Sequence, residues 1–206
     1  MTLESEDLLQ SILESLDRIN YIRPEDVPDI ELYMDQVTTF MGSRLKNSTR
    51  YPDGDKILTK TMINNYAKND LLPPPVRKKY SKEHVLVLIF IYYFKGFMSI
   101  SDIQTVLKPI TDEFFDKEDG FRLEDVYNEV FGMEREEVEQ LKVDVTEKFR
   151  KAQETFGGAP KEDQEFLRFF SFICLLSFDV YVKKLIIEKM IDTFRNEKKE
   201  PQEKRQ

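Results

Sequence analysis

Apolar residues recur at helical spacing along most of the chain. Between residues 4 and 20, leucines and isoleucines fall on one face every three or four positions, as an amphipathic helix requires. The same periodicity predicts further helices over about residues 30–44, 60–69, 81–94, 99–114, 123–131, 138–156 and 161–194. No window shows sustained alternation of apolar and polar residues. The pattern therefore predicts an all-α protein, a multi-helix bundle with at most a small β-wing near residues 74–80.

One of the predicted helices is apolar on every side. The run Val85–Phe94 contains no charged side chain, Ser81 is placed to cap its N-terminus, and Lys95-Gly96 ends it. Such a helix is typical of the centre of a core. At ten residues it is the longest unbroken apolar run, about half of the 20 that span a bilayer, so we expect no membrane segment.

Composition excludes several classes of protein. Seven glycines in 206 residues are too few for a turn-rich β-sandwich or barrel, and 16 phenylalanines with nine tyrosines exclude a disordered chain. The single cysteine, Cys174, cannot form an internal disulfide and lies in an apolar run, so we expect an inert core thiol and a reducing compartment. The acidic N-terminus is unlike a signal peptide, and together these features predict a cytoplasmic protein.

Charge is distributed unevenly along the chain. The net charge is −8, but residues 43–82 contain ten basic and three acidic residues, a local charge of +7 that leaves −15 for the remainder. This asymmetry predicts a basic module attached to an acidic body, or alternatively a solvated loop that happens to be basic. Within this segment, residues 44–58 form a long loop around a Pro-Asp-Gly turn.

The predicted helix over residues 60–69 has two chemically different sides. Ile63, Tyr66 and Ala67 share an apolar face suited to packing. The opposite side collects the polar residues Lys60, Thr61, Asn64, Asn65 and Lys68. Asparagine can bond adenine through both polar atoms, threonine can touch a thymine methyl group, and lysine can reach guanine or phosphate. The face is thus suited to a DNA major groove, although an ordinary solvated helix face has the same composition.

The order of motifs around this helix resembles the DNA-binding domain of the mercury-resistance-regulator (MerR) family of winged helix-turn-helix proteins. The matching motifs are Met62-Ile63-Asn64-Asn65-Tyr66 at the recognition helix, Asp70-Leu71-Leu72-Pro73-Pro74 at the turn, Arg77-Lys78-Lys79-Tyr80 at the wing, and Gly96-Phe97 with Ile100, Ile103 and Leu107 in the second helix pair. Asn64 replaces the family's recognition arginine, and Asn65 replaces one of its two tyrosines. The whole chain is also similar to an uncharacterised bacterial family of unknown function, which implies no activity.

The resemblance implies double-stranded DNA as a partner and a divergent helix-turn-helix domain over residues 35–115. This domain would lie between an N-terminal helix with its linker (residues 1–34) and a C-terminal helical region (residues 116–206) that serves dimerisation or binds an effector. The predicted DNA-contacting residues are Lys60, Thr61, Asn64, Asn65, Tyr66, Lys68, Arg77, Lys78, Lys79 and Tyr80, with Arg44, Lys46 and Arg50 of the basic loop. That loop could equally contact protein.

We find no motif that indicates catalysis or a cofactor. His84 is the only histidine, so no zinc site or Cys-His pair can be built around it, and we expect a structural role. Gly-rich phosphate loops, G-x-S-x-G and calcium-loop spacing are absent from the sequence. The sequence thus predicts a non-enzymatic, sequence-specific DNA-binding regulator. The alternative is a helical interaction or adaptor protein; an enzyme would need a pocket among the C-terminal helices.

The last predicted helix carries apolar residues at alternating spacings of four and three. The positions are Phe166, Phe170, Ile173, Ser177, Val180, Lys184, Ile187, Ile191 and Phe194. This is coiled-coil spacing with two polar interruptions, but Phe169, Phe172 and Leu175 make other faces apolar as well. We expect the first half of the helix to be core and the second half to be a possible seam of a homodimer.

Overall fold

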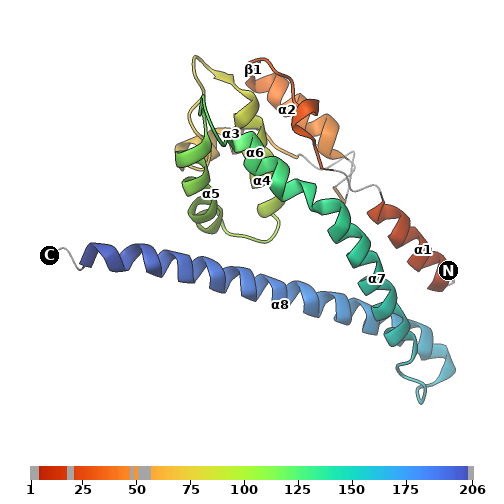
Figure 1. Ribbon diagram of the computed structural model, residues 1–206. Coiled ribbons are helices and arrows are strands. Elements are labelled where there is room, and N and C mark those ends of the chain that lie inside the picture. Colours follow the sequence, from red (N-terminus) through yellow and green to blue (C-terminus); the bar gives the residue numbers. More distant parts are fainter. Residues whose placement is uncertain (1–4, 18–20, 47–48, 51–56, 204–206) are drawn as a thin grey trace. The chain divides into compact units, whose positions relative to one another are not determined.

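The computed structural model describes residues 5–17, 21–46, 49–50 and 57–203. Within these ranges the elements are α1 (Ser5–Leu16), the 3-10 turn η1 (Pro24–Asp26), β1 (Leu32–Tyr33), α2 (Met34–Leu45), α3 (Lys60–Lys68), β2 (Lys79–Tyr80), α4 (Lys82–Phe94), α5 (Ile100–Phe114), α6 (Leu123–Gly132), α7 (Glu134–Gln153) and α8 (Lys161–Glu203) (Figure 1). Strands contribute only two short elements, so the predicted all-α class is confirmed. No helix of the described residues is long and apolar enough to cross a membrane.

The chain divides into two compact units. Unit 1 comprises Met1–Asn20 and Met133–Lys189, and unit 2 comprises Tyr21–Gly132 and Met190–Gln206. These boundaries differ from the expected division at residues 34 and 115. Residues 21–34 and α6 belong to unit 2, where the buried Tyr127 hydroxyl of α6 donates a hydrogen bond to the Ile22 carbonyl oxygen at 2.6 Å. Contacts between residues this far apart in the chain leave no periodic signal in the sequence.

Unit 2 is built around α4. Every residue from Val85 to Ile91 is at most 5 % exposed, which confirms the prediction of a central helix. The surrounding elements cover it on all sides with buried apolar side chains: Val37, Met41 and Leu45 from α2, Ile63 and Tyr66 from α3, Ile103 and Leu107 from α5, and Leu123, Tyr127 and Phe131 from α6. Because α4 has no polar side to expose, it depends on these neighbours to shield it from water.

A two-stranded antiparallel sheet joins the start of unit 2 to the segment before α4. Leu32 of β1 pairs with Tyr80 of β2, and Tyr33 pairs with Lys79. Leu32 and Tyr80 are buried, while Tyr33 on the other face is exposed. The expected wing near residues 74–80 is thus present as β2 and one bridge from Val76 to Lys79, but its pairing with β1 was not predicted. A two-residue strand is too short to show alternation.

Unit 1 has a much smaller core. Its buried residues are Val145, Phe149 and Ala152 of α7 and Phe172 of α8. Two leucines and one isoleucine of α1 and two leucines of α8 pack against them. The rings of Phe149 and Phe172 meet edge to face with centroids 5.4 Å apart. α7 begins at Glu134, earlier than the expected residue 138, and ends at Gln153. The three buried side chains of α7 cover only one side of α8 in this unit.

Two predictions about the last helix are wrong. Cys174 is exposed, not a core thiol. The first half of the four-three stripe is also exposed, since Phe166, Phe170 and Ile173 show 67, 51 and 42 % of their surface, whereas Ile191 in the second half is buried in unit 2. The buried side of α8 in unit 1 is instead the face of Phe172, roughly a third of a turn around the helix from the stripe. The helix also continues to Glu203, beyond the expected end near residue 194.

Candidate nucleic-acid interface

α3 is held in place by its cap and its apolar face. The Thr59 hydroxyl accepts a hydrogen bond from the Met62 backbone N–H at 3.2 Å, as expected of an N-cap. Ile63 and Tyr66 point into the core of unit 2, and the helix packs against α2. On the other side, the predicted polar residues Lys60, Thr61, Asn64, Asn65 and Lys68 are all exposed. The short helix therefore presents two adjacent amides and a hydroxyl to solvent.

The end of α3 is fixed by a network of backbone contacts. The Leu71 N–H donates to the Tyr66 carbonyl oxygen at 2.9 Å, and both Leu71 and Leu72 are buried. The Gln104 side chain of α5 donates from Nε2 to the Asn69 carbonyl oxygen at 2.9 Å. The Leu-Leu-Pro-Pro motif thus anchors the chain directly after the helix, and α3 cannot slide along its axis without breaking these contacts.

The segment after the prolines makes a tight reversal, here called the basic turn (Val76–Lys79). The Lys79 N–H donates to the Val76 carbonyl oxygen at 2.9 Å, while Arg77 and Lys78 have φ angles of 51° and 65°. Two successive left-handed residues define a type I′ hairpin turn, which ordinarily uses Asn-Gly because glycine lacks a Cβ and asparagine tolerates this conformation better than other residues. Here the two strained positions carry long basic side chains, and both are exposed.

Two predicted contact residues are not on the surface. Tyr66 and Tyr80 are 5 and 3 % exposed, and burial raises the pKa of both phenols. The Tyr80 ring meets the His84 ring edge to face with centroids 5.5 Å apart. These tyrosines support α3 and β2 from inside, which corrects their assignment as DNA-contacting residues. For Tyr66, its own helical spacing with Ile63 already indicated the buried face.

Several predicted basic contacts already have acidic partners. Lys60 pairs with Asp35, Lys79 lies 3.2 Å from Glu31, and Arg44 lies 3.6 Å from Asp26. All three acids come from residues 26–35, which fold beside the basic segment. The ion pairs are exposed, so each contributes little to stability, but each lowers the local positive potential. Among the described residues, no acidic side chain pairs with Lys68, Arg77 or Lys78.

The basic loop over residues 44–58 lies partly outside the described residues. Lys46 and Arg50 are exposed, and residues 47–48 and 51–56 are not described. Its far end is anchored, because Ile57 and Leu58 are buried and the Lys95 ammonium donates to the Ile57 carbonyl oxygen at 2.7 Å. The same burial lowers the pKa of Lys95.

His84 has the structural role that the sequence indicated. Its Nδ1 accepts a hydrogen bond from the Ser81 backbone N–H at 3.0 Å, so it closes a capping box at the start of α4 in place of the usual glutamate or glutamine. The ring packs between Tyr80 and Phe115, and burial lowers its pKa. In the described part of the chain, no group of three histidine, cysteine or acidic side chains is placed to hold a metal ion.

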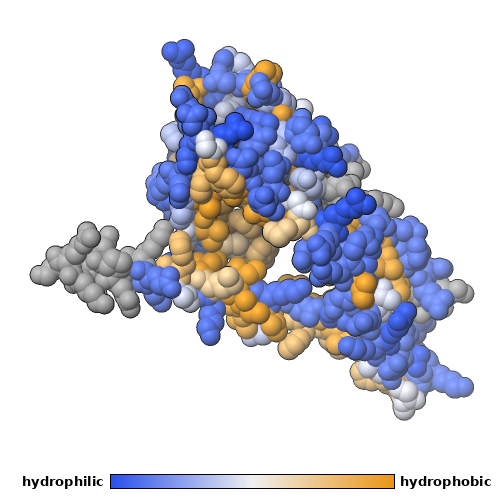
Figure 2. Space-filling model, in the orientation of Figure 1, coloured by the Kyte–Doolittle hydropathy of each residue, from blue (hydrophilic) through white to orange (hydrophobic). Residues whose placement is uncertain are grey.

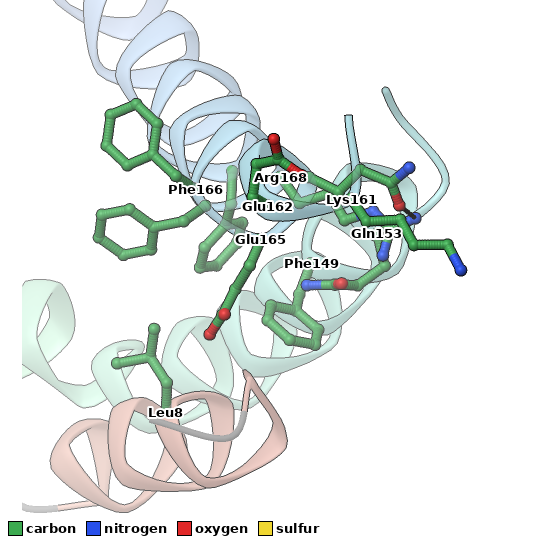
Figure 3. A pocket seen from close by; sticks show the side chains of 11 residues that line it. Leu8, Phe149, Gln153, Lys161, Glu162, Glu165, Phe166 and Arg168 are labelled. Carbon is green, nitrogen blue, oxygen red and sulfur yellow. Dashed lines mark hydrogen bonds between the residues drawn. The ribbon is translucent and has the colours of Figure 1, made fainter. Parts of the chain in front are cut away.

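Unit 1 contains a pocket partly formed by the C-terminal helices, where the active site of an enzyme would have to lie. A cavity of about 730 Å³ lies between α1, the end of α7 and the start of α8. Figure 3 shows Leu8, Phe149 and Phe166 contributed by these three helices, with Glu165 pointing from α8 toward α1. Its polar lining consists of glutamine, glutamate, lysine and arginine side chains, and includes no histidine, cysteine, serine or threonine. The pocket thus lacks a nucleophile with an adjacent imidazole base.

The fold and the site together define a small helical domain with an exposed polar helix and a strained basic turn. The chain belongs to the family described as Domain of unknown function (DUF1836), whose model matches residues 22–130. This range coincides closely with the Tyr21–Gly132 segment of unit 2, so the family's common part is the domain built around α4. Neither the comparison with curated proteins nor that with solved structures gave a match.

Proposed function

We propose that this protein binds double-stranded DNA in a sequence-dependent way and regulates transcription without an enzymatic step. The contact surface, here called the α3 surface, consists of Thr61, Asn64, Asn65 and Lys68 of α3 with Arg77 and Lys78 of the basic turn. The observation that carries the proposal is this combination of exposed amides on a rigidly held helix with an exposed, strained basic turn. Non-glycine residues in such conformations cost about 1–3 kcal/mol each and cluster at functional sites.

The order of elements in unit 2 supports the MerR-like interpretation. A helix and a loop precede the capped α3, and the buried Leu71-Leu72, the basic turn, the capped α4 and α5 follow in the order of the resemblance. α3 and β2 both pack against α2, so the two parts of the α3 surface share one support. In this proposal Asn64 and Asn65 read base edges in the major groove, while Lys68, Arg77 and Lys78 contact phosphates.

The acidic partners limit how strongly DNA is bound. With Lys60, Lys79 and Arg44 paired, the α3 surface offers Lys68, Arg77 and Lys78 to phosphates. For about three such contacts per chain, the logarithm of affinity falls with that of salt concentration at a slope of about −3. A basic surface with ten free cations would give a much steeper dependence. The proposal thus predicts modest affinity with a shallow salt dependence.

Fluorescence anisotropy on random and selected duplexes tests the proposal. Arg77→Ala with Lys78→Ala should weaken binding to every sequence and reduce the slope by about 2, whereas Asn64→Ala or Asn65→Ala should reduce discrimination between sequences by about 1–3 kcal/mol. Lys108→Ala with Lys117→Ala removes the same charge from unit 2 outside the α3 surface and serves as the matched control. No binding at low salt, or equal losses from the basic-turn variant and its control, would overturn the proposal.

A second candidate function is protein interaction. Ile30, Tyr33 and Val76 near the small sheet are 64, 56 and 65 % exposed, and apolar side chains grouped by a sheet favour contact with protein over DNA. The net charge of −8 points the same way. If this adaptor function is correct, Tyr33→Ser with Val76→Ser abolishes binding of the protein partner in cells. Arg77→Ala with Lys78→Ala then has no phenotype.

A further inference from the structure

Within unit 1, one side of α8 exposes an exceptional amount of aromatic surface. Five aromatic residues between Lys161 and Lys189 are 45–67 % exposed: Phe166, Phe169, Phe170, Phe178 and Tyr181. Figure 2 shows hydrophobic side chains along this helix. At about 200 Å² for a whole aromatic side chain, the five present roughly 600 Å². This area already equals that of the largest apolar patch on a typical monomer, and Ile173, Val180 and Leu185 add to it. We therefore expect another protein surface to cover it.

The exposed residues are arranged for a second helix. Phe166, Phe170, Ile173, Ser177, Val180 and Lys184 follow the four-three spacing at which two helices pack their side chains into each other's gaps. This stripe lies beside the face of Phe172, which already packs on α7, so both surfaces can be occupied at once. The 29 residues of α8 in unit 1 span about 43 Å, which is long enough to form such a seam.

The charges at the two ends of this part of α8 are opposite. Residues 161–165 carry one lysine and three acids, a net charge of −2, while residues 183–189 carry three lysines and one glutamate, a net charge of +2. A parallel pair of these helices would place like charges together. An antiparallel pair places the acidic end of each helix beside the basic end of the other. A two-fold rotation axis then relates the two helices, so both copies use the same surface.

We propose that α8 pairs with α8 of a second copy of this chain in an antiparallel orientation. Phe170 then faces Val180 of the other copy, Ile173 faces Ser177 near the two-fold axis, and Phe166 lies beside Lys184. Phe166, Phe169, Phe170 and Tyr181 lie in or beside the seam, and in two copies they present roughly 900 Å², which Ile173 and Val180 extend to about 1,200 Å², the lower limit of stable interfaces. This inference does not depend on DNA binding, and the failure of either leaves the other intact.

Light scattering of the full-length protein at about 50 µM gives the first test. The wild type should have twice the mass of a single chain, and Phe170→Glu or Val180→Glu should weaken dimerisation at least 100-fold, since a buried carboxylate has no partner in the seam. Val143→Glu makes the same change at a residue of α7 that is 62 % exposed, and it should remain dimeric. Circular dichroism verifies that each variant is folded. A monomeric wild type, or a dimeric Phe170→Glu protein, would overturn the proposal.

Charge reversal tests the orientation. Glu162→Lys with Asp163→Lys, or Lys183→Glu with Lys184→Glu, should each weaken the dimer several-fold, and combining all four should restore it. Spin labels give an independent distance. In a Cys174→Ser background, labels at Lys189→Cys should lie about 40 Å apart for an antiparallel pair centred near residue 175, against less than about 20 Å for a parallel pair. A dimer with the short distance, or without restoration in the combined variant, would contradict the antiparallel arrangement.

Discussion

α4 in unit 2 and the unit 1 part of α8 are both rich in apolar residues, but their surroundings differ completely. Seven consecutive residues of α4 are at most 5 % exposed, because α2, α3, α5 and α6 surround it. In unit 1, α8 buries Phe172 and exposes five aromatic side chains, because among the described residues only α7 and α1 pack against it in the core. Hydrophobicity along a helix thus predicts that its surface is covered, but it does not say whether the same chain provides the cover.

The largest expected effect separates these two helices directly. Leu88→Ala leaves a cavity at a fully buried position of α4 and should lower the free energy of unfolding by about 2–5 kcal/mol. Phe178→Ala removes a larger side chain that is 65 % exposed, and in the monomer it should change stability by less than about 0.5 kcal/mol. Urea titrations at a protein concentration of about 1 µM or less, followed by circular dichroism, measure the free energy of unfolding of both variants. Equal losses would mean that the α8 surface is buried within the monomer.

A smaller effect is expected where α6 closes over α4. Tyr127→Phe removes the hydroxyl that bonds the Ile22 carbonyl oxygen and leaves that buried oxygen without this donor. The free energy of unfolding should fall by about 1–2 kcal/mol. Tyr181→Phe makes the same change on the exposed side of α8 and should have no measurable effect in the same urea titration. An unchanged stability in Tyr127→Phe would show that the hydrogen bond is not what joins residues 21–34 to α6.

The cap of α4 should make the stability of unit 2 depend on pH. Burial lowers the pKa of His84 in the folded state, so the unfolded state binds the proton more readily. The stabilisation is complete above the unfolded pKa of about 6.5 and is lost as pH falls toward the folded value, by at most about 1.4 kcal/mol per pH unit. His84→Gln keeps an acceptor at the third position of the helix and should flatten the profile between pH 7.5 and 5.5. A profile that is the same in both proteins would exclude His84 as the source.

The smallest effect concerns the end of α8 that belongs to unit 2. Arg195 lies 2.9 Å from Asp102 and donates hydrogen bonds to Thr105 and Ser101 at the start of α5. The pKa of Asp102 is lowered by the Ser99 hydroxyl and further by Arg195. Arg195→Ala should increase hydrogen exchange over residues 190–197 while changing global stability by less than about 1 kcal/mol.

Asp102→Asn should produce the same local change in exchange as Arg195→Ala. Asp192→Asn is the matched control, because Asp192 lies 3.8 Å from the same arginine but is 70 % exposed. Unchanged exchange in Arg195→Ala would mean that contacts other than the Arg195 interactions, among them those of the buried Ile191, hold this segment in unit 2.

Much of the candidate site could be predicted from the sequence, and the errors have identifiable causes. The Thr59 cap, the exposed amides at Asn64 and Asn65, and the structural role of His84 all follow from local rules of spacing and capping. Tyr66 and Tyr80 were assigned to the surface by resemblance to a motif, and their burial shows that a matching residue type does not determine which way it faces. The basic turn was predicted as a basic segment, but its left-handed geometry was not, since Arg-Lys is not a turn-forming pair.

Helix positions and the identity of the central helix α4 were readable in the sequence, because both depend on the spacing of apolar residues within one segment. Contacts between distant segments depended on the tertiary structure. The pairing of Leu32 with Tyr80 and of Lys60 with Asp35 joins residues with no shared periodicity. Likewise, α8 could pack against α7 through several of its apolar faces. Only the positions of Val145 and Phe149 decided that Phe172 is buried and that Phe166, Phe170 and Ile173 remain exposed.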